Sequence, residues 1–123
     1  MTTVAIVEDE AILALDMADL CEASGCRVLG LAASAQQASV CFVGVEPEIL
    51  ITDMDLAEGS NGVEVVEILR RRWPGIRVIF VTAATSPGKL DLIRSARPAR
   101  ILAKPVCPSE LAKALRALAP AST

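Results

Sequence analysis

Four runs of apolar residues in this chain each end on polar residues of a different kind. The runs are Ala5-Ile6-Val7 before Glu8 and Asp9, Ile49-Leu50-Ile51-Thr52 before Asp53, Val78-Ile79-Phe80-Val81 before Thr82, and Ile101-Leu102-Ala103 before Lys104. Short, nearly continuous apolar runs are typical of parallel strands that are buried on both faces. In open α/β sheets, ligands bind beyond the carboxyl ends of the strands. The pattern therefore predicts that these polar side chains meet in one pocket.

Between these runs, apolar residues recur at helical spacing, and Gly, Pro and Asn mark the turns. We expect strands at 3–7, 27–32, 48–52, 76–81 and 100–103, and helices at 10–23, 35–44, 63–72, 88–95 and 110–118, the last capped by Ser109. Five strand-helix units without an internal linker predict an α/β fold with a parallel sheet and helices on both faces. Right-handed crossovers favour the flavodoxin-like, doubly wound (βα)5 strand order 2-1-3-4-5. Asp9 and Asp53 would then be neighbours.

Composition limits the class of protein. A chain of 123 residues fits a single domain, 1–123, and the short end of the chain after the last predicted helix, Pro120-Ala121-Ser122-Thr123, is expected to leave no room for an output domain. A net charge of −3 and an aromatic content of 2% disfavour direct binding of nucleic acid. The sequence has neither an apolar stretch of about 18–20 residues for a membrane span nor the pattern of a signal peptide. We expect a cytoplasmic protein.

Missing residue types and motifs exclude further functions. The absence of histidine rules out Ser-His-Asp and Cys-His catalysis and histidine-based metal sites, so any phosphohistidine must belong to a partner. The four cysteines lack zinc-type spacing and are expected to be small buried residues without a function; they are Cys21, Cys26, Cys41 and Cys107. Neither GxxxxGK[ST] nor GxGxxG occurs, so nucleotide binding has no support.

Crowded carboxylates at one sheet edge predict a divalent cation. Acidic groups held together repel one another, and Mg2+ relieves this by taking hard oxygen ligands. We expect Asp9 and Asp53 as direct ligands and Glu8 as a ligand through water. Asp9 alone could instead cap a helix, but Asp53 follows a strand and precedes a loop, so capping does not explain it.

The other two polar residues suit a phosphoryl group. The Lys104 ammonium can pair with phosphoryl oxygens and the Thr82 hydroxyl can donate to them. Phosphoryl transfer asks a protein mainly for positioning and charge stabilisation, which this pocket would supply. Asp53 is the candidate acceptor, and its acyl phosphate would be labile to water.

These residues resemble the receiver domain of bacterial two-component response regulators, in which a phosphohistidine donates to an aspartate. The resemblance covers the chain through Val4-Ala5-Ile6-Val7-Glu8-Asp9-Glu10, Ile51-Thr52-Asp53-Met54-Asp55-Leu56, Asn61-Gly62-Val63-Glu64, Ile79-Phe80-Val81-Thr82-Ala83 and Ala103-Lys104-Pro105. It implies Glu8 and Asp9 as the acidic pair, Asp53 as phosphoacceptor, Thr82 as switch hydroxyl, Lys104 as phosphate partner and the Asp55 backbone carbonyl as a third Mg2+ ligand. It also implies a cis bond between Lys104 and Pro105.

By this resemblance the chain is not a general enzyme: it catalyses only its own phosphorylation and dephosphorylation. The implied partners are a sensor histidine kinase or histidine phosphotransfer protein and a downstream protein target. The two-component signal would leave by protein contact or by phosphorelay.

The chain departs from the family pattern at three places. Ile101 stands where receivers usually carry an aromatic switch residue, and a β-branched side chain is stiff at χ1. Pro98-Ala99 replaces the usual Gly-Ala, and the arginines nearby form either a docking surface for an acidic partner or a solvated charge cluster; they are Arg94, Arg97 and Arg100. Asp55 adds a charge beside the acceptor, and we hypothesise that it alters the lifetime of the acyl phosphate.

Two other functions compete with this interpretation. Asp53-Met54-Asp55 resembles the paired aspartates of haloacid-dehalogenase-type phosphatases, although that family places the pair on its first strand. A binding module could also keep the receiver fold and signal without phosphate, which Ile101 favours slightly. Labelling with a phosphodonor distinguishes these functions.

Overall fold

Five parallel strands form one sheet in the order β2-β1-β3-β4-β5. The computed structural model describes residues 1–42, 44, 46–83 and 86–119. The strands are β1 (Thr3–Val7), β2 (Arg27–Ala32), β3 (Ile49–Thr52), β4 (Arg77–Thr82) and β5 (Arg100–Ala103). The observed strand order confirms the predicted fold class and strand order. The physical reason is that right-handed crossovers from each strand to the next leave few other windings.

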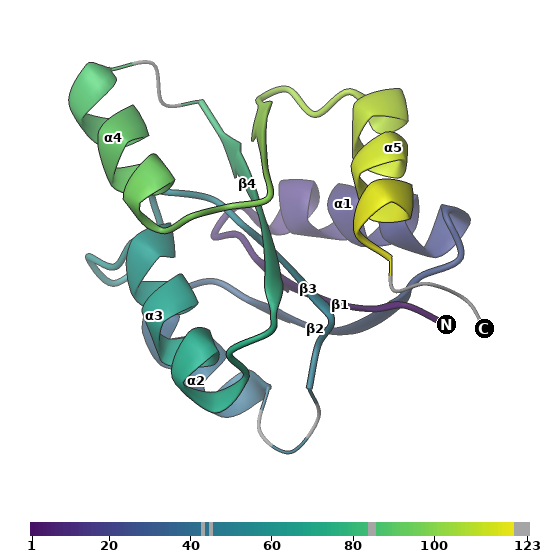
Figure 1. Ribbon diagram of the computed structural model, residues 1–123, viewed down its shortest axis with the longest axis horizontal. Coiled ribbons are helices and arrows are strands. Elements are labelled where there is room, and N and C mark those ends of the chain that lie inside the picture. Colours follow the sequence, from purple (N-terminus) through teal and green to yellow (C-terminus); the bar gives the residue numbers. More distant parts are fainter. Residues whose placement is uncertain (43, 45, 84–85, 120–123) are drawn as a thin grey trace.

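Helices cover both faces of the sheet (Figure 1). They are α1 (Ala11–Ala23), α2 (Ala35–Cys41), α3 (Gly62–Arg72), α4 (Pro87–Ser95) and α5 (Pro108–Leu118). α1 and α5 pack on one face, and α2, α3 and α4 lie on the other. This layering is what the alternation of strands and helices predicts.

Alternate residues of the central strands point into two separate cores. On β1, Val4 and Ile6 belong to the core under α1 and α5, whereas Ala5 and Val7 belong to the core under α2 and α3. All four side chains are fully buried. Because both faces are covered, β1, β3 and most of β4 consist of continuous apolar runs. Packing on both faces holds the carboxyl ends of these strands in fixed positions.

Two helix boundaries differ from the prediction by more than one residue. α2 ends at Cys41 rather than at residue 44, because Phe42 leaves the helix and is buried in the core; residue 43 lies outside the described residues. α5 begins at Pro108, so Ser109 lies inside the first turn and does not cap the helix. The cap position is Cys107, and proline at the first helical position fits the fixed φ of that residue.

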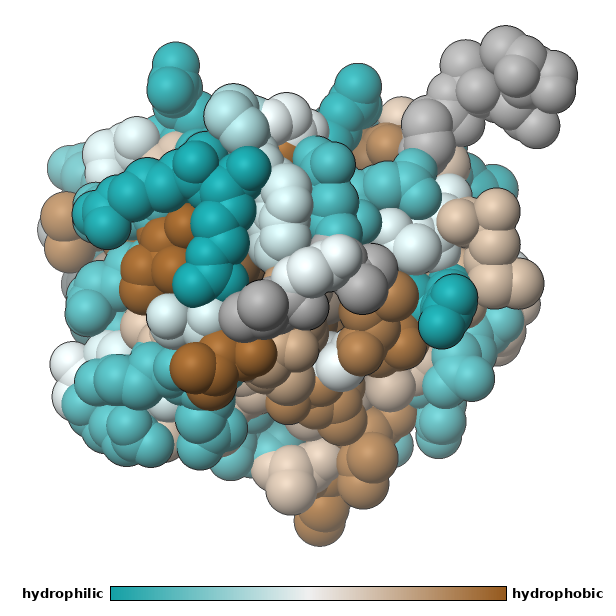
Figure 2. Space-filling view, turned by 90° about the horizontal axis from the view of Figure 1, so that it is seen from below, coloured by the Kyte–Doolittle hydropathy of each residue, from teal (hydrophilic) through white to brown (hydrophobic). Residues whose placement is uncertain are grey.

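Two of the four cysteines are exposed, contrary to expectation. Cys21 and Cys26 are buried as expected, and burial raises the pKa of Cys21 to about 12, but Cys41 and Cys107 are exposed. Seen from below Figure 1, hydrophobic side chains lie in separate groups among many hydrophilic ones (Figure 2). Among the residues that the structure describes, no helix is long and apolar enough to span a membrane.

Candidate functional site

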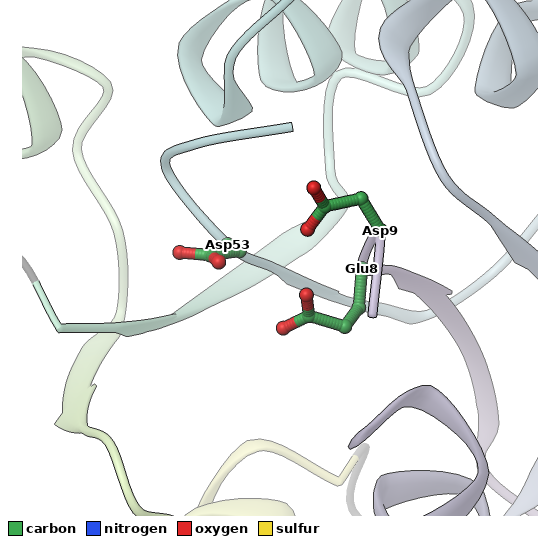
Figure 3. Close-up of side chains that lie close together, drawn as sticks. All are labelled: Glu8, Asp9 and Asp53. Atoms are coloured by element: carbon green, nitrogen blue, oxygen red, sulfur yellow. The ribbon is translucent and has the colours of Figure 1, made fainter. Parts of the chain in front are cut away.

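Three carboxylates meet where β1 and β3 end. The two strands are parallel neighbours with Val7 opposite Thr52, so the residues that follow them emerge side by side. The Asp53 amide donates to the Val7 carbonyl at 3.1 Å, which fixes the start of the loop after β3. One carboxylate oxygen from each of Glu8, Asp9 and Asp53 lies within 4.8 Å of the others. In Figure 3, the side chains of the neighbouring residues Glu8 and Asp9 both point toward the side on which Asp53 lies.

Lys104 brings a cation to these acids from the end of β5. Its Nζ lies 2.7 Å from Asp53 Oδ2 and 2.8 Å from Glu8 Oε1, and its side chain is 15% exposed. Burial acts to lower the pKa of Lys104, but the hydrogen bonds and charges of Asp53 and Glu8 outweigh it, so the pKa is raised. The ammonium therefore stays charged between the two carboxylates. The Lys104-Pro105 peptide bond is cis, as the resemblance implied.

Glu8 is the buried member of the acidic pair. Burial raises the pKa of Glu8, and the Lys104 contact opposes this only in part. Its Oε2 accepts a hydrogen bond from the Glu10 amide at 3.1 Å. Its Oε1 is buried and faces the Lys104 ammonium as an ion pair, without a well-directed hydrogen bond. A buried carboxylate oxygen with spare acceptor capacity is suited to a second cation.

The donor set fits Mg2+. Two of the three carboxylates are buried and the third, on Asp9, is exposed, so the site has access to water. Magnesium usually takes one or two carboxylates and keeps several waters. Asp9 does not serve as the helix cap that was considered above, because Glu10 occupies the cap position of α1 and no side chain caps it.

Asp53 is held by its backbone as well as its side chain. Its Oδ1 accepts a hydrogen bond from the Met54 amide at 2.6 Å, and its Oδ2 faces Lys104. Behind it, a Cβ on Gly62 would lie 2.2 Å from the Asp53 carbonyl oxygen and 2.7 Å from Phe80 Cε1. Gly62 is therefore a supporting residue of the site. In the sequence, Asn61-Gly62 is a turn signal and part of the resemblance to the family, and neither reveals this close approach.

The remaining predicted residues lie around this cluster. Thr82 ends β4 and is buried, and its carbonyl accepts from the Lys104 amide at 3.1 Å, so the two residues are on adjacent strand ends. Asp55 is exposed, and its carboxylate pairs with Lys89 at 3.0 Å. Ile101 lies on β5 opposite Phe80 and is 38% exposed. The structure thus brings Glu8, Asp9, Asp53 and Lys104 together with Thr82 on the neighbouring strand, while Ile101 lies at the surface.

A cavity opens beside the acids. It has a volume of about 650 Å³ and lies between α1 and the loop from β5 to α5. Glu8 and Lys104 are among the residues that line it, and Leu13, Met17 and Val106 give it apolar walls. A partner that reaches the carboxylates from this side would have an apolar surface to pack against.

Curated proteins are similar in sequence to this chain. The chain is 32% identical over 111 residues to the phyllosphere-induced regulator PhyR of Methylorubrum extorquens, an alignment that covers 89% of this chain and 40% of that protein. The chain spans about half or less of the length of the curated relatives it matches.

Solved structures show the same fold. The receiver domain of a modulated diguanylate cyclase from Desulfovibrio desulfuricans superposes with a TM-score of 0.86 at 26% identity, covering 96% of this chain and 93% of that one. A CheY-like receiver domain protein from Methanospirillum hungatei gives 0.85 at 22% identity, covering 95% and 92%. The family model for the response regulator receiver domain matches residues 4–116. This chain belongs to the family of response regulator receiver domains.

Proposed function

We propose that this chain accepts a phosphoryl group on Asp53 from the phosphohistidine of a sensor histidine kinase or histidine phosphotransfer protein, with Mg2+ bound beside it. The observation that carries the proposal is the placement of the Lys104 ammonium 2.7 Å from Asp53 and 2.8 Å from Glu8, within a cluster of three carboxylates. A cation of this kind beside a carboxylate nucleophile can pair with the oxygens of an incoming phosphoryl group.

The transfer exchanges one bond to phosphorus for another. A carboxylate oxygen of Asp53 attacks the phosphorus, the bond from phosphorus to the histidine nitrogen breaks, and the nitrogen keeps the electron pair. Lys104 stabilises negative charge on the phosphoryl oxygens, and the hydroxyl of Thr82, at the end of the adjacent strand β4, would donate to one of them. Glu8, Asp9 and Asp53, with the Asp55 carbonyl, would hold Mg2+, which neutralises charge on the carboxylates and the phosphoryl group. Attack by water at the acyl phosphate restores the Asp53 carboxylate and releases phosphate.

The cavity beside Lys104 supports docking of the phosphohistidine partner. α1 carries Ile12 and Leu15, which are 76% and 57% exposed, next to the helix face that lines the cavity. Exposed apolar residues beside an apolar cavity favour a protein partner. The signal then passes on by protein contact or by transfer of the phosphoryl group to another protein, and we place this activity in the cytoplasm.

Intact-mass measurement with a small phosphodonor and Mg2+ tests the proposal. The wild type should gain one phosphoryl group, and Asp53→Asn should gain none, because the amide is not a nucleophile. Asp91→Asn, which removes an exposed carboxylate on α4, is the matched control and should be labelled like the wild type. EDTA should suppress labelling. An unlabelled wild type would overturn the proposal and favour the non-phosphorylated binding module, whereas sustained turnover of a phosphomonoester would favour the phosphatase.

The same labelled protein tests the hypothesis on Asp55. Its carboxylate lies two residues beyond the acceptor and is exposed, so it can influence the water that attacks the acyl phosphate. Asp55→Asn should change the half-life of the label after the donor is removed. A half-life equal to that of the wild type would rule the hypothesis out.

A further inference from the structure

Positive charge is concentrated in one part of the chain. Residues 68–100 contain eight basic residues and one acidic residue, a net charge of +7. The rest of the chain contains four basic and fourteen acidic residues, a net charge of −10, which leaves the overall charge of −3. A charge asymmetry of this size within one small domain is typical of a surface that meets a charged partner.

The fold gathers arginines of this segment at the amino-terminal edge of the sheet. Arg77 and Arg100 are the first residues of the neighbouring strands β4 and β5. α3 and α4 end toward the same edge, and the Arg70 guanidinium at the end of α3 donates to the carbonyls of Ala96 and Arg97, just beyond α4. We call six exposed arginines the arginine patch: Arg71, Arg72, Arg77, Arg94, Arg97 and Arg100.

The arginine patch and the acid cluster lie at opposite ends of the sheet. In parallel strands all amino ends share one edge and all carboxyl ends share the other, and Asp53 and Thr82 are at the carboxyl ends of β3 and β4. Figure 2 shows the molecule from below, with several strongly hydrophilic side chains side by side at its left, the side on which Figure 1 places α3 and α4. A partner on the patch would leave the acid cluster accessible.

Helix stability explains only part of the arginine patch. Arginines in the last turns of α3 and α4 suit the negative ends of the helix dipoles. Arg77, Arg97 and Arg100 lie outside the helices, so the dipoles do not account for them. Within the described ranges, Arg94 is the patch residue with a carboxylate partner, Asp91 at 3.7 Å. The patch therefore presents guanidinium groups whose charge the fold itself does not neutralise.

Arg97 occupies a backbone position that favours glycine. Its φ of +51° lies in the left-handed region, and it follows the C-cap of α4, where glycine is the usual residue. Burial lowers the pKa of Arg70, and the nearby positive charge of Arg97 lowers it further, so the two side chains also repel each other. An arginine that is unfavourable both for the backbone and for its neighbour is better explained by binding than by stability.

We propose that the arginine patch is a docking surface for an acidic segment of a partner protein, rich in Asp and Glu. Guanidinium groups bind carboxylates through two parallel hydrogen bonds, which ammonium groups cannot do. A short acidic segment can lie on the patch alone, whereas a nucleic acid would extend past it and be repelled by the acidic remainder of the chain. Because the patch is remote from Asp53, docking does not depend on phosphorylation, and this inference does not rest on the proposed function.

Fluorescence anisotropy with a labelled peptide of alternating Glu and Ser, titrated with the full chain at an ionic strength of about 0.05 M, tests the docking surface. The wild type should bind it, and should lose affinity at about 1 M salt, where the Debye length is about 3 Å. The double variant Arg97→Gly/Arg100→Gln should raise the Kd about two- to thirtyfold, as for the loss of two exposed ion pairs. Thermal unfolding should find this variant as stable as the wild type, because glycine suits the left-handed backbone at position 97.

A matched control separates the patch from net charge. Arg27→Gln/Arg116→Gln removes two exposed arginines from β2 and α5, outside the patch, and should bind the peptide like the wild type. The same peptide with Gln in place of Glu should not bind. Absence of binding to the wild type, or equal losses in the two double variants, would overturn the proposal.

Two other occupants of the patch have distinct outcomes. Tighter binding of a single-stranded DNA of similar length, lost in Arg97→Gly/Arg100→Gln, would show a nucleic-acid surface and contradict the proposal. Self-association of the wild type in sedimentation without peptide, lost in the same variant, would show that a second copy covers the patch and would contradict it as well. Asp53→Asn should bind the peptide like the wild type, so a failure of the phosphoacceptor function and a failure of the docking surface are observed separately.

Discussion

The centre of the sheet and its β5-α4 side are built differently. β1 and β3 are covered on both faces, and their apolar residues are fully buried. β5 is an edge strand with three of its four residues exposed, and α4 buries one residue. The three carboxylates follow the densely packed central strands, whereas the Asp55-Lys89 ion pair connects the loop after β3 to the sparsely packed α4.

Dense and sparse packing suit different tasks, phosphoryl transfer on the one hand and conformational change on the other. Phosphoryl transfer needs groups held in fixed positions, which packed strands provide. A change of conformation needs an element whose contacts are weak enough to exchange, and such elements come from the less stable parts of a fold. The molecule therefore places its acid cluster where packing is dense, and α4 lies where packing is sparse.

Equivalent truncations in the two regions should give the largest contrast. Ile51 on β3 is fully buried and Ile101 on β5 is 38% exposed. Ile51→Ala should lower the free energy of unfolding by about 2–5 kcal/mol, because it leaves a cavity in a dense core. Ile101→Ala should cost less than about 1 kcal/mol, because much of the side chain is already in water. Urea unfolding followed by the fluorescence of Trp73 measures both, and equal losses would contradict the comparison.

Glycines near the starts of α3 and α4 give a second contrast. A Cβ on Gly62 would meet the Asp53 carbonyl oxygen at 2.2 Å, whereas a Cβ on Gly88 would have nothing within 4 Å. Gly62→Ala should destabilise the fold by about 1–3 kcal/mol or more, since the clash is with backbone. Gly88→Ala should stabilise it by about 0.5–1 kcal/mol, because alanine is the better helix residue. Thermal unfolding of the two variants compares them directly, and a stable Gly62→Ala would show that the acceptor loop is not rigid.

A substitution in the acid cluster should change the free energy of unfolding least of the three, and the change should depend on pH. Burial raises the pKa of Glu8 above 4.5, so the folded state binds its proton more tightly than the unfolded state. Stability from this group is present below pH 4.5 and is lost as pH rises through the folded pKa. Glu8→Gln removes this dependence on pH. At pH 7, without added divalent cation, the free energy of unfolding of Glu8→Gln should equal that of the wild type or be higher by less than about 1 kcal/mol.

Unfolding curves between pH 4 and 8 check this expectation. Glu67→Gln, which removes an exposed carboxylate on α3, serves as the control and should keep the wild-type pH profile. A wild-type stability that rises with pH through the same window would mean that the Lys104 ion pair outweighs the burial of Glu8.

Much of the fold and site could be predicted because both follow from periodicity. The apolar runs give buried parallel strands, and crossover handedness sets β1 beside β3, so Asp9 and Asp53 could be placed together before any coordinates. The residue at each strand end follows directly from the run that precedes it. The larger errors in element bounds fall at helix ends: Phe42 leaves α2 to fill the core, and Pro108 starts α5 before Ser109.

The sequence by itself determined the order of the elements, the strand-end chemistry and the family to which the chain belongs. Only the tertiary structure decided which side chains touch: that Lys104 lies between Glu8 and Asp53, that Gly62 packs against the acceptor, and that Lys89 pairs with Asp55. Periodicity fixes the face and the end of an element on which a residue lies. Contacts between residues far apart in the sequence depend on how those elements pack, and local patterns contain no information on their distances.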